Sequence, residues 1–101
     1  AKPDAEFITW SYQDDAPIER HLFERMLGEL PETVVRAKGF LNLKDEPDRR
    51  TILQLVGRRW ALSPGRIWDD ETPQTRIVLI GENGQLVQEQ LAAALDACTH
   101  R

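Results

Sequence analysis

The sequence is poor in the residues that disulfides, membrane spans and secretion signals require. Its single cysteine, Cys98, excludes a disulfide within the chain and is typical of a reducing compartment. The longest apolar runs, such as residues 77–80, are far shorter than the ~20 residues that a transmembrane helix needs. Residues 1–6 lack the apolar stretch of a signal peptide. We therefore expect a cytoplasmic protein that binds no membrane.

Methionine is equally scarce. The only one, Met26, falls within a helical pattern, and a strand pattern begins directly at Phe7. The 101 residues, 41% apolar and 30% charged, fit one globular domain that spans residues 1–101. The missing initiator methionine favours a piece excised from a longer protein. The alternative is a small protein that lost this residue, which the small side chain of Ala1 permits.

Catalytic motifs are missing as well. No glycine is followed at the required distance by Gly-Lys-Ser or Gly-Lys-Thr, so these residues form no phosphate-binding loop. The two serines, Ser11 and Ser63, have no histidine pattern nearby that would supply a base. The acidic pairs at residues 14–15 and 69–70 are better interpreted as a helix cap and a solvated loop. We expect no enzyme activity from this chain.

A metal site is not expected either. Cys98 and His100 supply two potential ligands, whereas a structural zinc site needs four and a catalytic one three. The other histidine, His21, lies on the polar edge of a helical stripe. Cys98 is therefore interpreted as a small buried apolar side chain. We expect these residues to bind no cofactor.

The periodicity of the apolar residues predicts an α+β fold. A 3.6-residue period predicts one helix that starts at Asp14 and Asp15 and ends at Pro31, and a second one over residues 87–98, after a turn at Asn83 and Gly84. Strand patterns cover residues 7–12, 33–43, 51–56 and 76–80, with a reversal into 58–62 and an irregular stretch over 63–74. The order β-α-β-β-β-β-α implies a mostly antiparallel sheet with two helices packed on one face.

Charge is unevenly distributed along the chain. Residues 36–76 carry nine basic and six acidic side chains, whereas the rest carries four basic and eleven acidic ones, for a net charge of −4. If the helices cover the face of Val35, Ala37, Leu41 and Leu43, the opposite face carries the alternating set Arg36, Lys38 and Phe40, with Ile52, Gln54 and Arg59. Such a mixed surface suits docking to an acidic partner. The alternative is a solvated face on which Arg and Lys stems cover apolar residues.

The chain has three tryptophans, and the sequence predicts a different role for one of them. Trp10 and Trp60 are expected in the core, whereas Trp68 lies in the irregular stretch, in a loop between Arg66 and Asp69, and is the best candidate for an exposed anchor. The predicted partner-binding residues are Arg36, Lys38, Phe40, Arg59 and Trp68.

An ordered series of short segments resembles a known family. Residues 29–31 read Glu-Leu-Pro, residues 35–40 read Val-Arg-Ala-Lys-Gly-Phe, and a Pro-containing acidic turn and Gln-Leu-Val-Gly at 54–57 follow. Trp68, the strand that ends in Ile80-Gly81, and a closing helix that ends in Ala-Cys fit as well. Nearly the whole chain thus resembles the C-terminal domain of the CobW-type GTPases.

The resemblance implies a role for the domain rather than a reaction. It implies an N-terminal P-loop GTPase domain ahead of this chain, in a family associated with cobalamin biosynthesis and with GTP-dependent metal insertion or homeostasis. GTP, Mg²⁺ and a transition metal such as Zn or Co would bind that missing domain. The chain would be an accessory domain of a metallochaperone, and its partner would be its own GTPase domain or a metalloprotein client.

Two other functions stay open at this point. One is a free-standing interaction module that forms a homodimer through its sheet face. The more distant one is an RNA-binding domain, because Lys38-Gly39-Phe40 opens like an RNA-recognition signature. The match stops at residues 41–43, and the chain is acidic overall, so we expect no nucleic-acid partner.

Overall fold

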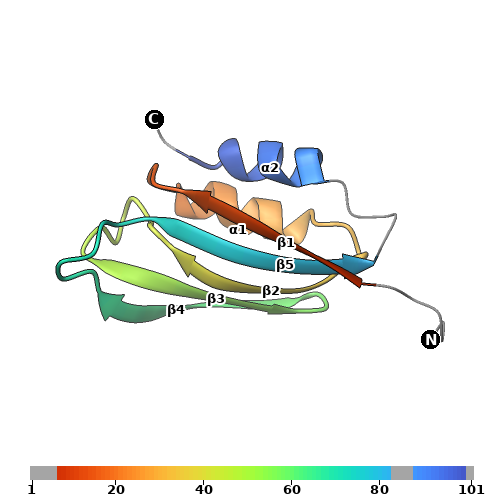
Figure 1. Cartoon of the computed structure of the whole chain (residues 1–101), viewed down its shortest axis with the longest axis horizontal. Coiled ribbons are helices and arrows are strands. Elements are labelled where there is room, and N and C mark those ends of the chain that lie inside the picture. The colour runs from red at the N-terminus through yellow and green to blue at the C-terminus, as the bar shows by residue number, and fades with distance from the viewer. Residues whose placement is uncertain (1–6, 83–87, 100–101) are drawn as a thin grey trace.

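The computed structural model describes residues 7–82 and 88–99, and it shows one sheet with two helices on the same face (Figure 1). The predicted α+β fold and the order of its elements are confirmed. The elements are β1 (Phe7–Asp14), α1 (Arg20–Gly28), β2 (Val34–Leu41), β3 (Arg49–Val56), β4 (Arg59–Ile67), β5 (Thr75–Glu82) and α2 (Gln88–Asp96). The expected turn at residues 83–84 and the start of the second helix at Val87 lie outside the described residues.

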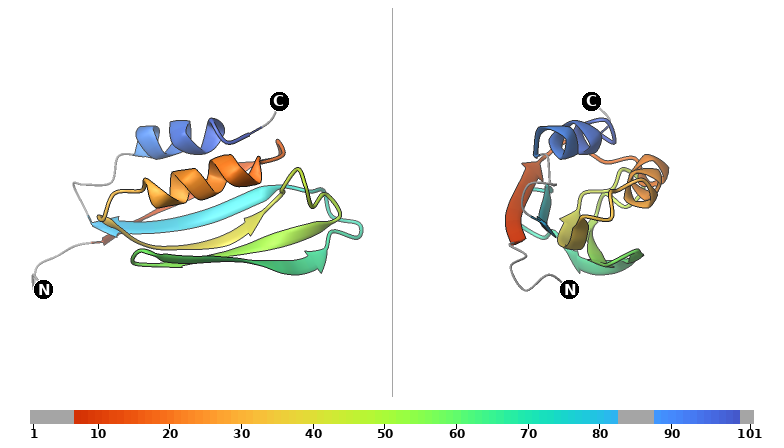
Figure 2. Two further views of the ribbon diagram at one scale, coloured as in Figure 1. Left: turned by 180° about the vertical axis from the view of Figure 1, so that it is seen from behind. Right: turned by 90° about the vertical axis from the view of Figure 1, so that its right-hand side faces the viewer.

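The strands pair in the order β1-β5-β2-β3-β4, and every pair is antiparallel. Strand β5 therefore lies in the interior of the sheet, which explains its continuous apolar run. Figure 2 shows the two helices side by side over one face, running in opposite directions. The other face of the sheet carries no helix in the part of the chain that the structure describes.

The core fills the space between the helices and the sheet. Alternate residues of the inner strands, such as Leu53, Ile77 and Leu79, meet the apolar stripes of both helices. Phe23 of α1 and Leu95 of α2 are at most 1% exposed, and each such side chain contributes about 1.5–3 kcal/mol by its burial. The rest of the core comprises Tyr12, Ile18, Leu27, Val34, Ala37, Leu41, Leu43, Leu55, Leu91 and Cys98.

The start of α1 differs from the prediction. Asp14 ends β1 and its Oδ1 accepts the backbone N–H of Ala16 at 3.2 Å, so it caps a turn and not the helix. The chain bends at Ala16 and pairs again at Ile18, whose N–H donates to the Asn42 carbonyl at 2.8 Å. Ile18 is fully buried and also bridges Thr99, so tertiary pairing delays the helix to Arg20. The helix ends at Gly28 rather than at Pro31.

A bulge near the start of β2 changes which valine enters the core. The pairing of β2 with β5 shifts register between Val34 and Arg36, and Val34 is 3% exposed. The expected core position of Val35 is therefore wrong, because Val35 is only half-buried. The strand ends at Leu41, and Asn42 is buried rather than solvated, since its N–H donates to Thr75 Oγ1 at 3.0 Å.

Strand β4 is longer than predicted. It includes residues 63–67, which the sequence predicts to be irregular. Pro64 is tolerated because β4 is an edge strand. The pairing with β3 shifts register opposite residues 49–51, where β4 has one residue more than β3. Trp60 lies on this edge strand and is 37% exposed, so its expected core position is wrong. Trp10 is half-buried and packs against the core.

No helix in residues 7–82 and 88–99 is both long and apolar enough to cross a membrane.

Gly39 allows β2 to approach β5 closely. A Cβ at this position would lie 2.0 Å from the carbonyl oxygen of Arg76 and 2.8 Å from the Cα of Ile77. Both atoms belong to the backbone, so no side-chain rotation relieves the clash. The backbone φ of Gly39, 154°, is also one that residues with a side chain rarely adopt.

We expect Gly39→Ala to lower the free energy of unfolding by about 2–4 kcal/mol, because β2 and β5 must separate. Gly28→Ala is the matched control, since a Cβ there meets nothing within 4 Å and its φ is not positive. Urea unfolding followed by circular dichroism measures both variants. If the two variants are equally stable, the backbone of β5 leaves room for a Cβ at residue 39.

Tyr12 ties β1 to α2. Its hydroxyl donates to Asp96 Oδ1 at 2.7 Å, and Asp14 Oδ2 lies 3.3 Å from the same hydroxyl oxygen. Burial of the phenol, followed by its hydrogen bond to Asp96, raises the pKa of Tyr12 well above its usual 10.0. The folded state therefore keeps the phenol proton at a pH where the unfolded chain has released it.

The free energy of unfolding is expected to fall as the pH rises above about 10, and the contribution of Tyr12 is fully present below that pH. Tyr12→Phe removes the hydrogen bonds, costs about 1 kcal/mol at neutral pH and makes the alkaline decrease less steep. Burial also raises the pKa of the Cys98 thiol, so both proteins are compared in a Cys98→Ala background. The measurement is urea unfolding from pH 8 upwards. An equally steep decrease in both would exclude Tyr12 as its cause.

Candidate docking surface

The face of the sheet opposite the helices brings four of the five predicted residues together. Arg36 pairs with Ile80 of β5 and Val56 of β3, and Lys38 pairs with Val78 and Gln54. The three rows across the sheet are Thr9-Ile80-Arg36-Val56-Arg59, Ser11-Val78-Lys38-Gln54-Ala61 and Gln13-Arg76-Phe40-Ile52-Ser63. We call these fifteen residues the open face. The predicted placement of Arg36, Lys38 and Phe40 opposite the helices, with Ile52, Gln54 and Arg59, is confirmed.

The open face is positively charged. It carries four exposed cations, Arg36, Lys38, Arg59 and Arg76, and its fifteen residues include no acidic side chain. The next pair on the same side of the sheet, Phe7 with Glu82, adds one exposed ring and one exposed carboxylate. The ion pairs among the described residues use other cations. No partner within the described chain therefore neutralises these four charges, and their field extends into solvent.

Two adjoining hollows run across this face. The first, of about 360 Å³, is lined by Arg36, Lys38, Gln54, Val56, Val78 and Ile80. The second, of about 480 Å³, continues past Phe40 and Arg76 towards Ser11 and Gln13 of β1. Both hollows are lined by Lys38 and Val78, so they form one trough, in which Arg36 and Lys38 of β2 lie between Val78 and Ile80 of β5 on one side and Val56 of β3 on the other. A face that combines exposed aliphatic side chains with cations is typical of a surface that another protein covers.

Sequence reasoning missed the contribution of β5. Arg76, Val78 and Ile80 reach the open face because β5 lies beside β2, which is a long-range pairing. The apolar run of β5 faces both sides of the sheet, so its sequence does not show which residues are uncovered. Only the charge of Arg76 within that run signals an exposed position.

Trp68 is buried, so the expectation of an exposed anchor is wrong. Its side chain is 4% exposed, and its ring lies edge-on to Phe40 with the centroids 5.8 Å apart. The guanidinium of Arg50 lies 4.7 Å from the Trp68 ring and 5.4 Å from the Phe40 ring. Arg50 also donates to the carbonyl of Ile67 at 3.0 Å and pairs with Glu71. Through these contacts Arg50 holds Trp68, in the segment after β4, against Phe40 at the end of the open face.

We expect Trp68→Ala to lower the free energy of unfolding by about 3–5 kcal/mol, as for other buried aromatic side chains. Trp68→Phe is the control, because it keeps a ring against Arg50 and the indole Nε1 has no hydrogen-bond partner among the described residues. Urea unfolding measures both. A loss below about 0.5 kcal/mol in Trp68→Ala would instead indicate a surface position.

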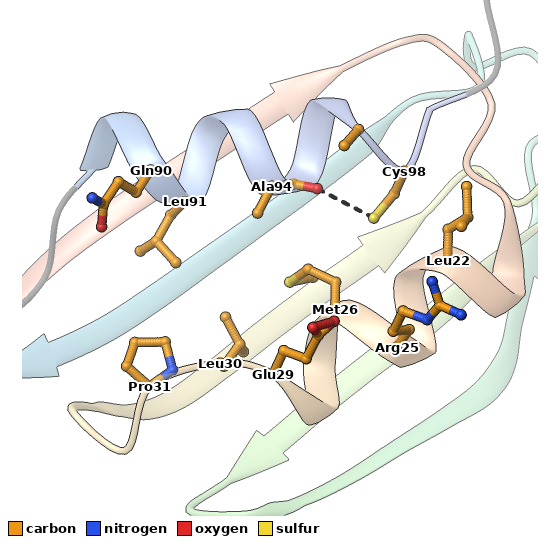
Figure 3. A pocket seen from close by; sticks show the side chains of 11 residues that line it. Leu22, Arg25, Met26, Glu29, Leu30, Pro31, Gln90, Leu91, Ala94 and Cys98 are labelled. Carbon is orange, nitrogen blue, oxygen red and sulfur yellow. Dashed lines mark hydrogen bonds between the residues drawn. The ribbon is translucent and has the colours of Figure 1, made fainter.

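A separate hollow, on the other side of the sheet, lies between the two helices (Figure 3). It has a volume of about 390 Å³, and Met26, Leu30, Leu91 and Ala94 are among the apolar residues that line it. At its end the thiol of Cys98 donates to the carbonyl oxygen of Ala94 at 3.3 Å (Figure 3). Burial raises the pKa of the Cys98 thiol. The thiol therefore stays protonated at neutral pH and is a poor metal ligand.

The described residues do not fit a metal ion. No group of three or more histidine, cysteine and acidic side chains lies close enough together in residues 7–82 and 88–99 to hold one. The side chain of His21 is 77% exposed, and its Nδ1 lies 3.9 Å from Glu19 Oε2. His100 lies outside the described residues. We therefore derive no chemistry for this chain that passes through a bound metal.

The fold and the open face define a small α+β domain with an uncovered cationic sheet face. The sequence profile described as the cobalamin synthesis protein cobW C-terminal domain matches residues 7–99. The chain therefore belongs to the CobW C-terminal domain family, as its sequence resemblance predicted.

Similar proteins support this assignment. The zinc chaperone YjiA of Escherichia coli (strain K12) is 32% identical over 87 residues, which are 86% of this chain and 26% of that protein. A crystal structure of Zn(II)-bound YjiA GTPase from E. coli matches with a TM-score of 0.76 and 28% identity. A triple mutant of Zn(II)-bound YjiA GTPase matches with a TM-score of 0.78. Both structures cover 93% of this chain, which spans 30% of theirs.

Proposed function

We propose that this chain is the accessory C-terminal domain of a cytoplasmic, GTP-dependent metallochaperone, and that it acts by docking through its open face. Its partner is the GTPase domain of the same protein or a metalloprotein client. The observation that carries the proposal is the trough with its four cations, none of which has an ion pair among the described residues. The family membership and the short span of YjiA that the chain covers support it.

The chemistry of the whole protein belongs to the GTPase domain in this proposal. That domain binds GTP, Mg²⁺ and a metal such as zinc or cobalt, for metal homeostasis or cobalamin biosynthesis. The present chain supplies a surface whose affinity for its partner depends on the nucleotide state. Docking then couples the nucleotide state to metal delivery. The coupling requires that the partner binds the open face more tightly in one nucleotide state than in the other, because only a difference in affinity shifts a conformational equilibrium.

A homodimer through the open face is disfavoured by its charge. Two copies of this face would place like charges opposite one another, which costs several kcal/mol at an interface. The same cations attract an acidic partner and accelerate its association. The exposed Val56, at 57%, and the half-buried Val78 and Ile80 supply the apolar area that such a partner buries.

Charge reversal tests the docking face. The double variant Arg36→Glu, Lys38→Glu is expected to weaken binding of the 101-residue chain to the GTPase domain encoded upstream by at least about tenfold. Isothermal titration calorimetry at low and high salt measures it. The matched control is Arg25→Glu, Lys44→Glu, which changes the net charge equally but alters exposed cations away from the open face.

Two outcomes would contradict the proposed function. The first is unchanged binding in the double variant when circular dichroism shows an intact fold. The second is a coding sequence with a start codon directly before Ala1, in place of a P-loop motif such as Gly-Lys-Ser further upstream. Concentration-dependent sedimentation of the chain alone would favour the homodimer through the open face if the double variant alters it.

A further inference from the structure

We propose that the outer edge of β1, over residues 7–13, pairs with the same edge of a second copy of this chain, so that two five-stranded sheets join into one. The inference does not depend on the proposed function, because a strand added beside β1 lies in the plane of the sheet and leaves the open face uncovered. It rests on the backbone groups at this edge, on the protection of the opposite edge and on the sequence of β1.

Four residues of β1 direct their backbone N–H and C=O groups away from the sheet. The N–H of Glu82 donates to the Thr33 carbonyl at 3.0 Å, so the backbone of Glu82 points towards the start of β2 and away from β1. Phe7 lies opposite Glu82, so these two residues form a pair without mutual hydrogen bonds, and the two kinds of pair alternate from there without a register shift. The residues whose backbone groups point outward are Phe7, Thr9, Ser11 and Gln13. The described residues offer these groups no hydrogen-bond partner.

The two edges of the sheet differ in how they are protected. Strand β4 carries Pro64, two arginines and a register shift opposite residues 49–51, and each of these hinders the addition of a further strand. Residues 7–13 of β1 include no charge, proline or glycine, and they pair with β5 in an unbroken register. Ile8 and Trp10, on the helix side of β1, are only half-buried, so α2 does not close over this edge. Only a paired strand would satisfy such an edge.

The sequence of β1 is complementary to itself in the antiparallel direction. A two-fold axis at Trp10 places Phe7 opposite Gln13 of the second copy and Thr9 opposite Ser11 of the second copy. All the outward-pointing residues of both copies then exchange hydrogen bonds with one another. An axis at Ser11 instead leaves Phe7 without a residue of the second β1 to pair with. The axis at Trp10 is therefore the register that satisfies the edge.

Side chains on the helix side support the same axis, and charge limits the strength of the dimer. Trp10 meets Trp10 of the second copy and Ile8 meets Tyr12, which are aromatic and aromatic–β-branched pairs that stabilise a sheet. Beyond residue 13 the same alignment of the two sequences sets Asp14 against Glu6, and each copy has a net charge of −4. We therefore expect a transient dimer that strengthens when salt screens these charges.

Sedimentation velocity of the 101-residue chain at concentrations up to about 1 mM, in low and high salt, tests the pairing. Ser11→Pro removes one outward N–H and no hydrogen bond to β5, and we expect it to weaken self-association at least about tenfold. Ser11→Thr, which keeps the N–H, is the matched control and should associate as the unaltered chain does. Circular dichroism establishes that both variants fold.

A second pair of variants tests the register without a proline. Thr9→Lys combined with Ser11→Glu places opposite charges against each other across the axis at Trp10, whereas Thr9→Lys combined with Ser11→Lys places like charges there. We expect the first variant to associate more tightly than the second. Net charge by itself predicts the reverse order, because the two lysines bring the chain closer to neutrality.

Four results would overturn the inference. A chain that stays monomeric at about 1 mM excludes a second copy as the occupant of this edge. Undiminished association of a folded Ser11→Pro variant, or tighter association of the doubly lysine-substituted variant, would show that β1 does not pair in this way. Loss of self-association in the variant Arg36→Glu, Lys38→Glu would assign the contact to the open face. None of these measurements involves the GTPase domain, so the dimer and the proposed function can fail separately.

Discussion

The antiparallel insertion of β5 between β1 and β2 is the constraint on which the rest of the structure depends. It directs Ile77 and Leu79 to the helices and Val78 and Ile80 to the opposite face, because side chains alternate along a strand. Gly39 makes the insertion possible, since any side chain there would meet the backbone of β5. The core and the open face therefore arise from the same pairing.

The apolar side chains on the two faces of the sheet differ in what covers them. The helices cover one face and bury Leu53, Ile77 and Leu79 on it, while Tyr12 ties β1 to α2 and Ile18 pairs with Leu43 and Thr99. The other face keeps a trough in solvent, in which the cations of β2 lie between aliphatic side chains of β5 and β3. A domain that needs no partner would gain stability by covering such a trough, so its exposure is the physical basis of the proposed docking role.

Cations serve two distinct purposes in this chain. Arg50 is 5% exposed and satisfied by carbonyl oxygens, a carboxylate and two aromatic rings, so its charge organises the chain around it. Arg36, Lys38 and Arg76 are exposed, and the described residues provide them with no ion pair. Removing the first kind of cation disturbs the fold, whereas altering the second kind changes what the surface attracts.

The sequence by itself determined the α+β class, the order of the elements and the side of the sheet on which Arg36, Lys38 and Phe40 lie, because a strand's two-residue alternation is local. Only the tertiary structure decided the burial of Trp68, the late start of α1 at Arg20 and the place of Arg76 on the open face. Trp68 depends on Arg50, the helix start on the pairing of Ile18, and Arg76 on its register with Phe40. Each of these contacts joins residues far apart in the chain, and no local pattern encodes them.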